Sequence, residues 1–428
     1  MNIQTYTKPP LDTRFLATNV ISWKIRKKPT FDHGKYVIRF EITLNNGETI
    51  PKQIGGFKTE ADAYAAKENL ILTLGNHQFI PYQFTVQEFY DYWLYYYMLD
   101  EAMISYNTFI SYRKSIERFI EYVGAKKKIN SLTSNNIEQA LKKYPTKNLR
   151  KMAYSMMASS FKYAITHHIV QTNHAVTAIR TTKFQLKENC SPEKERPTFS
   201  LEELVLLFRT CRKIESSIYL LMILSATTGT RISETIGLCY EDIDFIKKEV
   251  HINFQLGRKF ESDYSDGVML ERVNVKTRNG VRKIPLPDFV MDEIVLKKCK
   301  HDLEKQNDPG FYKNADYILT RDHGYPMHRG QHEKLNHVLE AAGFDPSEYT
   351  WHDIRHSYAT ILKDNKMNFK LVSKLMGHGS EEFTDKHYVN HHKNVTIYDV
   401  SVIMNQFYSK LININPVYDI SKMDYSFL

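Results

Sequence analysis

The chain has 428 residues, a length that predicts two or three domains. Its 58 lysines and arginines against 49 aspartates and glutamates give a formal net charge of +9, which favours an acidic polymer over an acidic small substrate as its partner. Its four cysteines are scattered, which excludes a small protein held together by disulfides and a zinc site built from paired cysteines. Its longest apolar run, residues 219–224, is too short to span a bilayer, which excludes a membrane-spanning protein. Because its amino terminus lacks the apolar core of a secretory signal, the protein is expected in the reducing cytoplasm with no membrane partner.

An amino-terminal domain over residues 1–80 is predicted as a small sheet covered by one helix. Three segments alternate apolar and polar residues in the way that is typical of strands: 20–26, 35–44 and 48–54. The Asn46-Gly47 pair marks a hairpin turn between the last two. An alanine-rich segment over 59–74 opens with a capping box and predicts the covering helix.

The same alternation assigns residues to the two faces of this sheet. The first strand contributes three apolar residues to the covered face: Ile21, Trp23 and Ile25. Lys24, Arg26 and Arg39 then lie on the open face, a basic surface of the kind that enters a nucleic-acid groove. The alternative is a plain module whose basic face is only solvated.

A mainly helical domain is predicted over residues 83–186. Four segments repeat apolar residues at three- and four-residue spacing: 84–99, 105–124, 133–144 and 146–170. Arg113 and Lys114 lie off the apolar stripe of the second segment. They either solvate the helix or contact nucleic acid.

A polar, proline-containing stretch indicates a linker over residues 187–197. A mixed domain of helices and strands is predicted from 198 to 400, and a tail from 401 to 428. The amphipathic pattern over 396–412 predicts a helix that docks on a neighbouring protomer.

Arg231 is the first basic residue of the 198–400 domain in a setting that suits a phosphate. One helix is predicted to stop at Gly229, and Arg231 lies just inside the start of the next, with Glu234 three residues on to orient its guanidinium. Backbone N–H groups and the positive end of the helix dipole favour an anion there. A plain surface ion pair between Arg231 and Glu234 is the alternative.

Lys276 is predicted to lie at the tip of a β-hairpin. One strand ends at Lys276, a turn covers 277–280, and a return strand runs over 281–286. A flexible ammonium at such a tip can reach a neighbouring site and donate a proton. Three other residues compete for this role: Arg278, Arg282 and Lys283. A solvated basic hairpin is the alternative.

Residues 350–356 place three basic side chains on one helix. Thr350 and Asp353 form a capping box, so a helix begins near Trp351. Its first turns carry three basic side chains: His352, Arg355 and His356. The two histidines have the i, i+4 spacing of a zinc pair, whereas His352 with Arg355 suits a phosphate, which accepts hydrogen bonds from both. Read alone, the stretch leaves both possibilities open.

A final helix is predicted to end at Gly377, followed by His378 and, ten residues later, by Tyr388. A tyrosine hydroxyl has a pKa of about 10 in water, so it attacks only where cations or a base ease its proton away.

Six residues resemble, in this order, the catalytic set of the tyrosine recombinases, the phage integrase family: Arg231, Lys276, His352, Arg355, His378 and Tyr388. TGTRISETIGL resembles the family's first arginine box, HDIRHSYAT its H-x-x-R box, LMGH the turn before the nucleophile, and KTRNGVRKIPL the β-hairpin lysine. One position departs from the pattern, because Asn390 stands where the family often has a histidine. The layout is similar to that of integrases of conjugative transposons and temperate phages.

The resemblance implies a multidomain fold. It comprises a three-stranded sheet with a helix that binds arm-type DNA, a mainly helical domain that binds core-type DNA, and an α+β catalytic domain of tyrosine-recombinase type. It implies a recombinase that integrates and excises a mobile element or prophage through a 3′-phosphotyrosyl bond, without cofactor or metal. The implied partners are double-stranded DNA, a homotetramer on that DNA, an excisionase and a host DNA-bending protein in a bacterial nucleoid.

Beside Arg231 and His378, Arg355 completes a phosphate clamp, which disfavours zinc binding by His352 and His356. Two functional alternatives remain. A type IB topoisomerase shares the tyrosine chemistry, and a catalytically silent DNA-binding relative could keep the fold.

Overall fold

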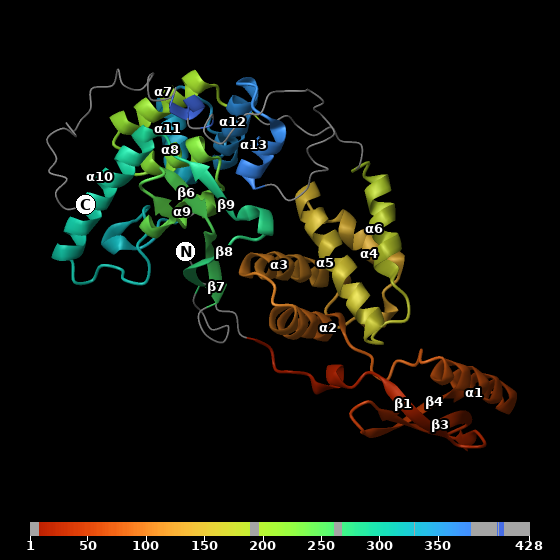
Figure 1. Cartoon of the computed structure of the whole chain (residues 1–428). Coiled ribbons are helices and arrows are strands. Elements are labelled where there is room, and N and C mark those ends of the chain that lie inside the picture. Colours follow the sequence, from red (N-terminus) through yellow and green to blue (C-terminus); the bar gives the residue numbers. More distant parts are fainter. Residues whose placement is uncertain are drawn as a thin grey trace. The chain divides into compact units, whose positions relative to one another are not determined.

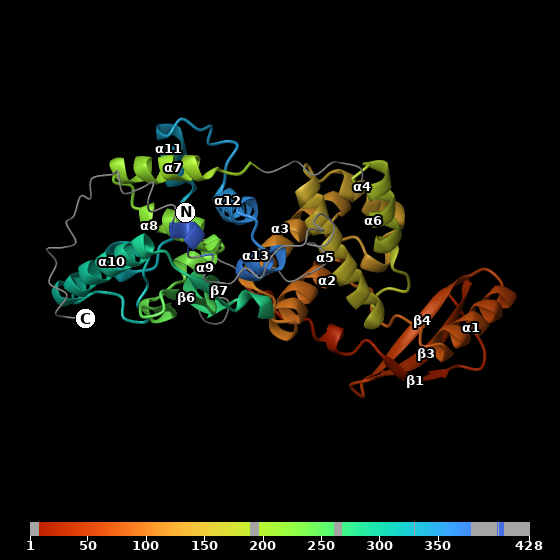
Figure 2. The same cartoon turned by 45° about the horizontal axis from the view of Figure 1, so that its top comes forward.

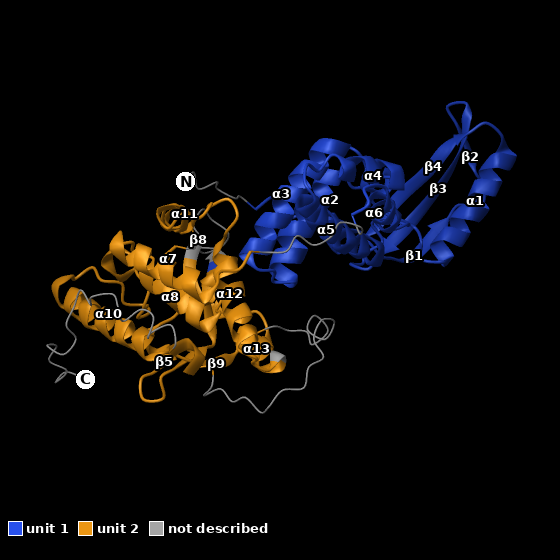
Figure 3. Ribbon diagram, turned by 90° about the horizontal axis from the view of Figure 1, so that it is seen from above, with its two compact units in different colours: residues 1–193, 258–268 blue, residues 194–257, 269–428 orange. Residues whose placement is uncertain are grey.

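The computed structural model describes residues 8–188, 197–260, 268–328, 330–377, 400 and 402–405. It divides into two compact units, one of residues 1–193 with 258–268 and one of residues 194–257 with 269–428 (Figure 3). Within the described ranges, no helix combines the length and the hydropathy needed to cross a membrane.

The border between the units falls inside the predicted linker 187–197. The first residues of that stretch belong to the helical part of the first unit, because Glu188 is buried there. Its carboxylate accepts hydrogen bonds from Arg150 Nε at 2.6 Å and from the Tyr154 hydroxyl at 3.0 Å.

The first unit begins with an antiparallel sheet whose central strand is β3 (Figures 1 and 2). The strands are β1 (Val20–Ile25), β2 (Thr30–Asp32), β3 (Lys35–Leu44) and β4 (Thr49–Phe57). Helix α1 (Glu60–Gly75) covers one face, where Ile38, Phe40 and Ile42 pack against Leu70 and Leu74. The predicted covered sheet is confirmed, but it has four strands and not three, because the three-residue β2 is too short to give an alternation signal.

A bulge in β1 corrects one face assignment. Val20 pairs with Leu44 and Ser22 with Thr43, so Ile21 is an extra residue in this strand. Ile21 is therefore 59% exposed and does not share the covered face with Trp23 and Ile25, as the uninterrupted alternation predicted.

The helical part of the first unit contains the four predicted helices and one more. Its elements are α2 (Val86–Tyr92), continued by a π-helix (Trp93–Glu101), then α3 (Tyr106–Val123), a 3-10 turn (Ile129–Ser131), α4 (Ser134–Lys142), α5 (Lys147–Thr166) and α6 (His174–Gln185). Helix α6 is not among the predicted helices. This helix buries Ala175, Ala178 and Thr182, and such small side chains give little periodic apolar signal.

Residues 8–16, here called the amino-terminal strap, precede the sheet but pack on the helical part of the same unit. Phe15 stacks on Phe84 with ring centroids 3.8 Å apart and on Tyr92 at 4.3 Å. At the other end of the sheet module, Tyr82 packs against both the sheet core and the helical core. The sheet module is thus attached to the helical part at both of its ends.

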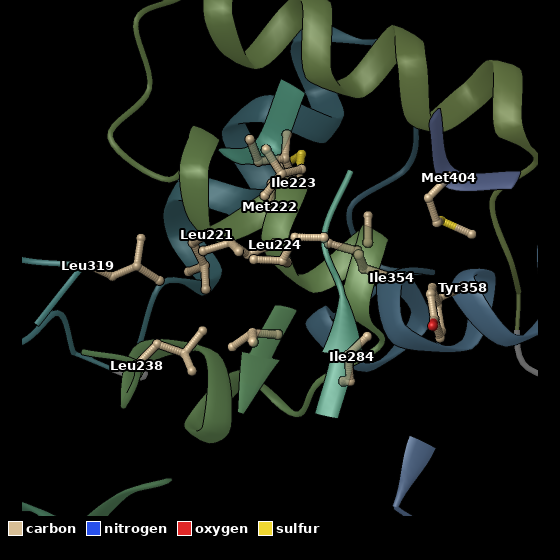
Figure 4. Packing of buried hydrophobic residues seen from close by; sticks show 14 of the residues in the cluster. Leu221, Met222, Ile223, Leu224, Leu238, Ile284, Leu319, Ile354, Tyr358 and Met404 are labelled. Carbon is tan, nitrogen blue, oxygen red and sulfur yellow. The ribbon is translucent and has the colours of Figure 1, made fainter. Parts of the chain in front are cut away.

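The second unit surrounds one large apolar core. Its helices are α7 (Leu201–Lys213), α8 (Tyr219–Thr228), α9 (Ile232–Ile236), α10 (Asp288–Asn307), α11 (His332–Ala341), α12 (Trp351–Asp364) and α13 (Phe369–Met376), with 3-10 turns at Tyr240–Asp242, Arg278–Gly280 and Asp322–Gly324. Residues 221–224 of α8 are fully buried, and Ile284 and Ile354 lie in the same cluster (Figure 4). Helix α12 packs on α8 and on α13, which also contacts β9.

The strands of this unit pair differently from the prediction. One antiparallel sheet has the order β5 (Ile243–Asp244), β6 (Glu249–Ile252) and β9 (Arg282–Pro285), and a second pairs β7 (Phe254–Phe260) with β8 (Val268–Asn274). The predicted hairpin with Lys276 at its tip is therefore wrong. Its two strands belong to different sheets, because β8 takes β7 as its partner and β9 takes β6.

Part of the predicted tail packs within its own chain. Val400 and Met404 are fully buried in the core of the second unit. The side-chain oxygen of Asn405 accepts a hydrogen bond from the backbone N–H of Asp288 at 3.1 Å. Docking of the tail on a neighbouring protomer stays a prediction.

We expect Ile354→Ala to lower the free energy of unfolding by about 2–5 kcal/mol, because it removes fully buried methyl groups from the core between α12 and α8. The matched control is Ile246→Ala, since Ile246 is 94% exposed and its loss should change stability by no more than about 0.5 kcal/mol. Urea denaturation measures both variants, and equal effects of the two would contradict the assigned core.

Candidate active site

Gly229 ends α8 in the left-handed region, with φ +60°. A Cβ at this position would lie 2.3 Å from Cδ1 of Tyr358 on α12, so only glycine permits both the turn and the close approach of α12. Two residues later Arg231 caps the start of α9. The core packing of α8 and α12 thereby brings Arg231 near Arg355.

The carboxylate of Glu234 is the centre of the candidate site. Its side chain is 2% exposed. It accepts hydrogen bonds from Arg231 Nη1 at 2.6 Å, from the Arg231 backbone N–H at 2.9 Å and from Arg282 Nη2 at 2.8 Å. Arg355 Nη1 lies 3.9 Å from the same carboxylate. The predicted orientation of Arg231 by Glu234 is present, but Arg231 uses its own N–H for Glu234 and not for an anion.

The charges around Glu234 do not balance. Burial alone would raise the pKa of Glu234, but Arg282 and Arg231 outweigh it and lower that pKa. Burial together with the neighbouring Arg231 lowers the pKa of Arg355 to about 9, against the opposing effect of Glu234. One carboxylate among three guanidinium groups leaves a surplus of two positive charges, which favours binding of an anion.

Arg355 is buried, and its side chain hydrogen-bonds to the backbone of two segments of the unit. Its Nη1 donates to the carbonyl oxygen of Gly229 at 2.8 Å, and its Nη2 donates to that of Met376 at 2.5 Å. These bonds use two of the five N–H donors of a guanidinium. Its Nε takes part in neither bond. Arg231, whose side chain is 41% exposed, faces solvent.

The start of α12 agrees with the capping box predicted from Thr350 and Asp353. Asp353 Oδ2 accepts hydrogen bonds from the backbone N–H and the hydroxyl of Thr350, both at 2.7 Å. The acid that a zinc protease would use to activate water is thus part of a helix cap. His352 is exposed, and its ring lies 4.6 Å from that of His356. Among the described residues, no group of three or more His, Cys, Asp and Glu side chains is placed to hold a metal ion.

Lys276 is exposed and lies in a short turn that links the two sheets. The turn is ordered by a hydrogen bond from the Gly280 N–H to the Thr277 carbonyl at 2.9 Å, in place of the free hairpin tip that was predicted. The three residues that compete with Lys276 for the role of proton donor lie in different environments. Arg282 is buried, Lys283 lies on the opposite face of β9, and Arg278 is exposed in the turn itself.

Two predicted site residues, His378 and Tyr388, lie outside the described residues. The described chain leads to the first of them, because α13 ends at Gly377 with φ +66°. Arg231 Nη2 donates to the Gly377 carbonyl oxygen at 3.3 Å. The backbone directly before His378 is therefore part of the cluster around Glu234.

The predicted DNA-contacting residues lie in the first unit. Lys24 pairs with Glu41 across β1 and β3, and Arg26 lies opposite Arg39, so the three basic residues share the face that α1 does not cover. Arg39 is also paired with Asp32 at 2.6 Å. On α3, Lys114 is exposed, whereas Arg113 pairs with Glu117 at 3.0 Å.

The second unit matches a known protein family. Residues 198–394 match the model of the phage integrase family. This part of the chain is a domain of that family, the tyrosine recombinases, and the protein is a site-specific DNA recombinase.

Two relatives and one solved structure illustrate the likeness. A "Tyrosine recombinase XerC-like" protein of Caldanaerobacter subterraneus subsp. tengcongensis is 25% identical over 84% of this chain and 93% of its own length. The transposase from transposon Tn916 of Enterococcus faecalis is 29% identical over 48% of this chain and 51% of its own. The Tn1549 transposon integrase, solved in complex with a circular intermediate DNA, has the same fold, with a TM-score of 0.56, 20% identity, and coverage of 72% of this chain and 96% of that one.

The lowered pKa of Glu234 predicts a dependence of stability on pH. A carboxylate whose pKa is lower in the folded state stabilises the fold above its unfolded pKa of 4.5, and this stabilisation is lost as the pH falls through the folded value. We expect Glu234→Gln to be clearly less stable than the wild type at pH 7, and the difference in the free energy of unfolding to shrink below pH 4.5. Denaturation at several pH values measures it, and a difference that does not change with pH would rule out the ionised carboxylate.

Proposed function

We propose that the protein cleaves and rejoins DNA strands through a covalent bond between Tyr388 and a 3′-phosphate, and thereby integrates and excises a mobile element or prophage. The observation that carries the proposal is the surplus of positive charge around Glu234, in a domain of the phage integrase family. A phosphodiester under attack gathers negative charge on its non-bridging oxygens, and preorganised cations stabilise it.

The proposed roles follow from the position and chemistry of each group. Arg231 and Arg355, with the imidazoles of His352 and His378, hold the non-bridging oxygens of the scissile phosphate. Tyr388 attacks the phosphorus and forms a new P–O bond, while the bond to the 5′-oxygen breaks. Lys276 donates a proton to that leaving oxygen. The exposure of Lys276 and the half-exposure of Arg231 support these roles, since both can reach DNA.

Rejoining is the reverse of the first step. The 5′-hydroxyl of a partner strand attacks the phosphotyrosyl bond and releases Tyr388. The energy of the original phosphodiester is kept in the covalent intermediate, so the exchange needs no nucleotide hydrolysis.

The first unit supplies two candidate DNA surfaces. The open sheet face with Lys24, Arg26 and Arg39 is proposed to bind arm-type sites, and the basic side of α3 with Arg113 and Lys114 to bind core-type sites. The Tn1549 integrase complex with circular intermediate DNA supports binding of such DNA.

We extend the proposal to the assembly. Four copies act on two duplexes, and the tail of residues 401–428 docks on a neighbouring protomer. An excisionase and a host DNA-bending protein set the direction of the exchange. Crossover products on paired sites would support this reading over a topoisomerase, which relaxes supercoiled DNA without exchanging strands, and over a silent DNA-binding relative.

Tyr388→Phe is expected to abolish the covalent protein–DNA adduct on a nicked suicide substrate, because it removes the attacking oxygen. Tyr398→Phe serves as the matched control and should keep the adduct. Gel electrophoresis under denaturing conditions detects the adduct, and its persistence in the Tyr388→Phe protein would remove Tyr388 as the nucleophile.

Lys24→Gln is expected to weaken binding to arm-type DNA and to reduce the slope of log K against log salt by about 0.9, because one phosphate contact is lost. Lys67→Gln is the control, since Lys67 lies on α1, which covers the other face of the sheet. Binding titrations at several salt concentrations measure the slope. Equal effects of the two substitutions would show that the open face is not the binding surface.

A further inference from the structure

Arg282 is a buried cation that the proposed chemistry does not use. Its side chain is 3% exposed, and each of its three nitrogens donates a hydrogen bond to a different segment of the second unit. Nε donates to the Leu375 carbonyl at 2.6 Å, Nη1 to the Gly280 carbonyl at 2.8 Å, and Nη2 to Glu234 at 2.8 Å. All three nitrogens of Arg282 are thus bonded within the second unit, whereas Arg355 bonds backbone carbonyls through its two Nη atoms only.

The three acceptors belong to three different parts of the proposed active site. Gly280 closes the turn that carries Lys276. Leu375 lies in the last turn of α13, directly before the backbone that leads to His378. Glu234 is the carboxylate that orients Arg231. Arg282 therefore joins the proposed proton donor to the proposed phosphate clamp through one rigid, planar group.

The end of α13 comes close both to the guanidinium of Arg282 and to the turn that carries Lys276. A Cβ on Gly377 would lie 3.0 Å from Arg282 Nη1 and 3.1 Å from the Asn279 carbonyl oxygen. A Cβ on Gly280 would lie 2.9 Å from Cγ2 of Val275. The Lys276 turn, Arg282 and the end of α13 are thus in direct contact.

A buried charge is a costly way to hold chain segments together, because apolar packing of the same volume is often as stable or more so. A guanidinium instead fixes direction, since its donors meet three acceptors only in one orientation. A guanidinium is therefore suited to fixing the position of a turn relative to the segments packed against it.

We propose that Arg282 is a positioning residue that sets the Lys276 turn against the phosphate clamp, so that transfer of a proton to the leaving 5′-oxygen depends on it. The inference rests on the proposed recombinase function and assigns Arg282 no contact with the substrate. A general acid that is misplaced by about 1 Å loses much of its effect.

The test compares two suicide substrates, one with the natural 5′-oxygen and one with a 5′-bridging sulfur, whose thiolate leaves without a proton. Arg282→Lys should cleave the oxygen substrate about 10- to 100-fold more slowly than the wild type. The sulfur substrate should restore most of that loss, as it should for Lys276→Ala. Arg231→Lys should be slow on both substrates, because the clamp acts whatever the leaving group.

Arg272→Lys is the matched control, since Arg272 is also a largely buried arginine, paired with Glu241 and Asp242. It should leave both rates unchanged. Gly280→Ala is a second probe that leaves Arg282 and Glu234 intact but moves the turn, so it applies even if Arg282→Lys does not fold. It should show the same selective loss on the oxygen substrate.

Equal loss on both substrates in a folded Arg282→Lys protein, or no loss in Gly280→Ala, overturns the positioning role. A wild-type protein that forms no adduct with either substrate overturns instead the proposed function, so the two failures are distinguishable.

Discussion

The ion pairs of Glu234 hold together the parts of the catalytic unit that come from distant parts of the chain. A carboxylate buried alone would be protonated, and three guanidinium groups without it would repel one another. The carboxylate therefore allows the guanidinium groups to lie close together, and the guanidinium groups allow the carboxylate to be buried in its ionised form. Because the guanidiniums outnumber the carboxylate, the cluster is complete as a fold but unbalanced in charge. In the proposed mechanism, the scissile phosphate supplies the missing negative charge.

The buried arginines show how the site is prepared before DNA arrives. Arg355 and Arg282 donate to backbone carbonyls of Gly229, Gly280, Leu375 and Met376, most of which lie at helix ends or turns where such oxygens lack a helical partner. These bonds replace water around the charges and fix their direction. Little reorganisation is then needed when charge develops on the phosphate.

The sequence was sufficient to predict features that depend on residues close together in the chain. The pairing of Arg231 with Glu234 and the cap of Thr350 with Asp353 depend on three-residue spacings, and both are present. The prediction of a hairpin was wrong because strand pairing also depends on segments elsewhere in the sequence: β8 pairs with β7, and β9 pairs with β6. The part played by Arg282 could not be read from the sequence, because two of its acceptors are backbone oxygens, which leave no trace in the identity of Gly280 or Leu375.

The amino-terminal strap has a consequence for how the sheet module meets DNA. A module joined by one linker explores many orientations, whereas Phe15 on one side and Tyr82 on the other attach this module at both ends to the helical part of the first unit. In the proposed binding mode, part of the rotational entropy of binding two DNA segments at once is then lost during folding and not at the encounter. The spacing between the two segments that one protein copy would bridge in this mode is correspondingly narrow.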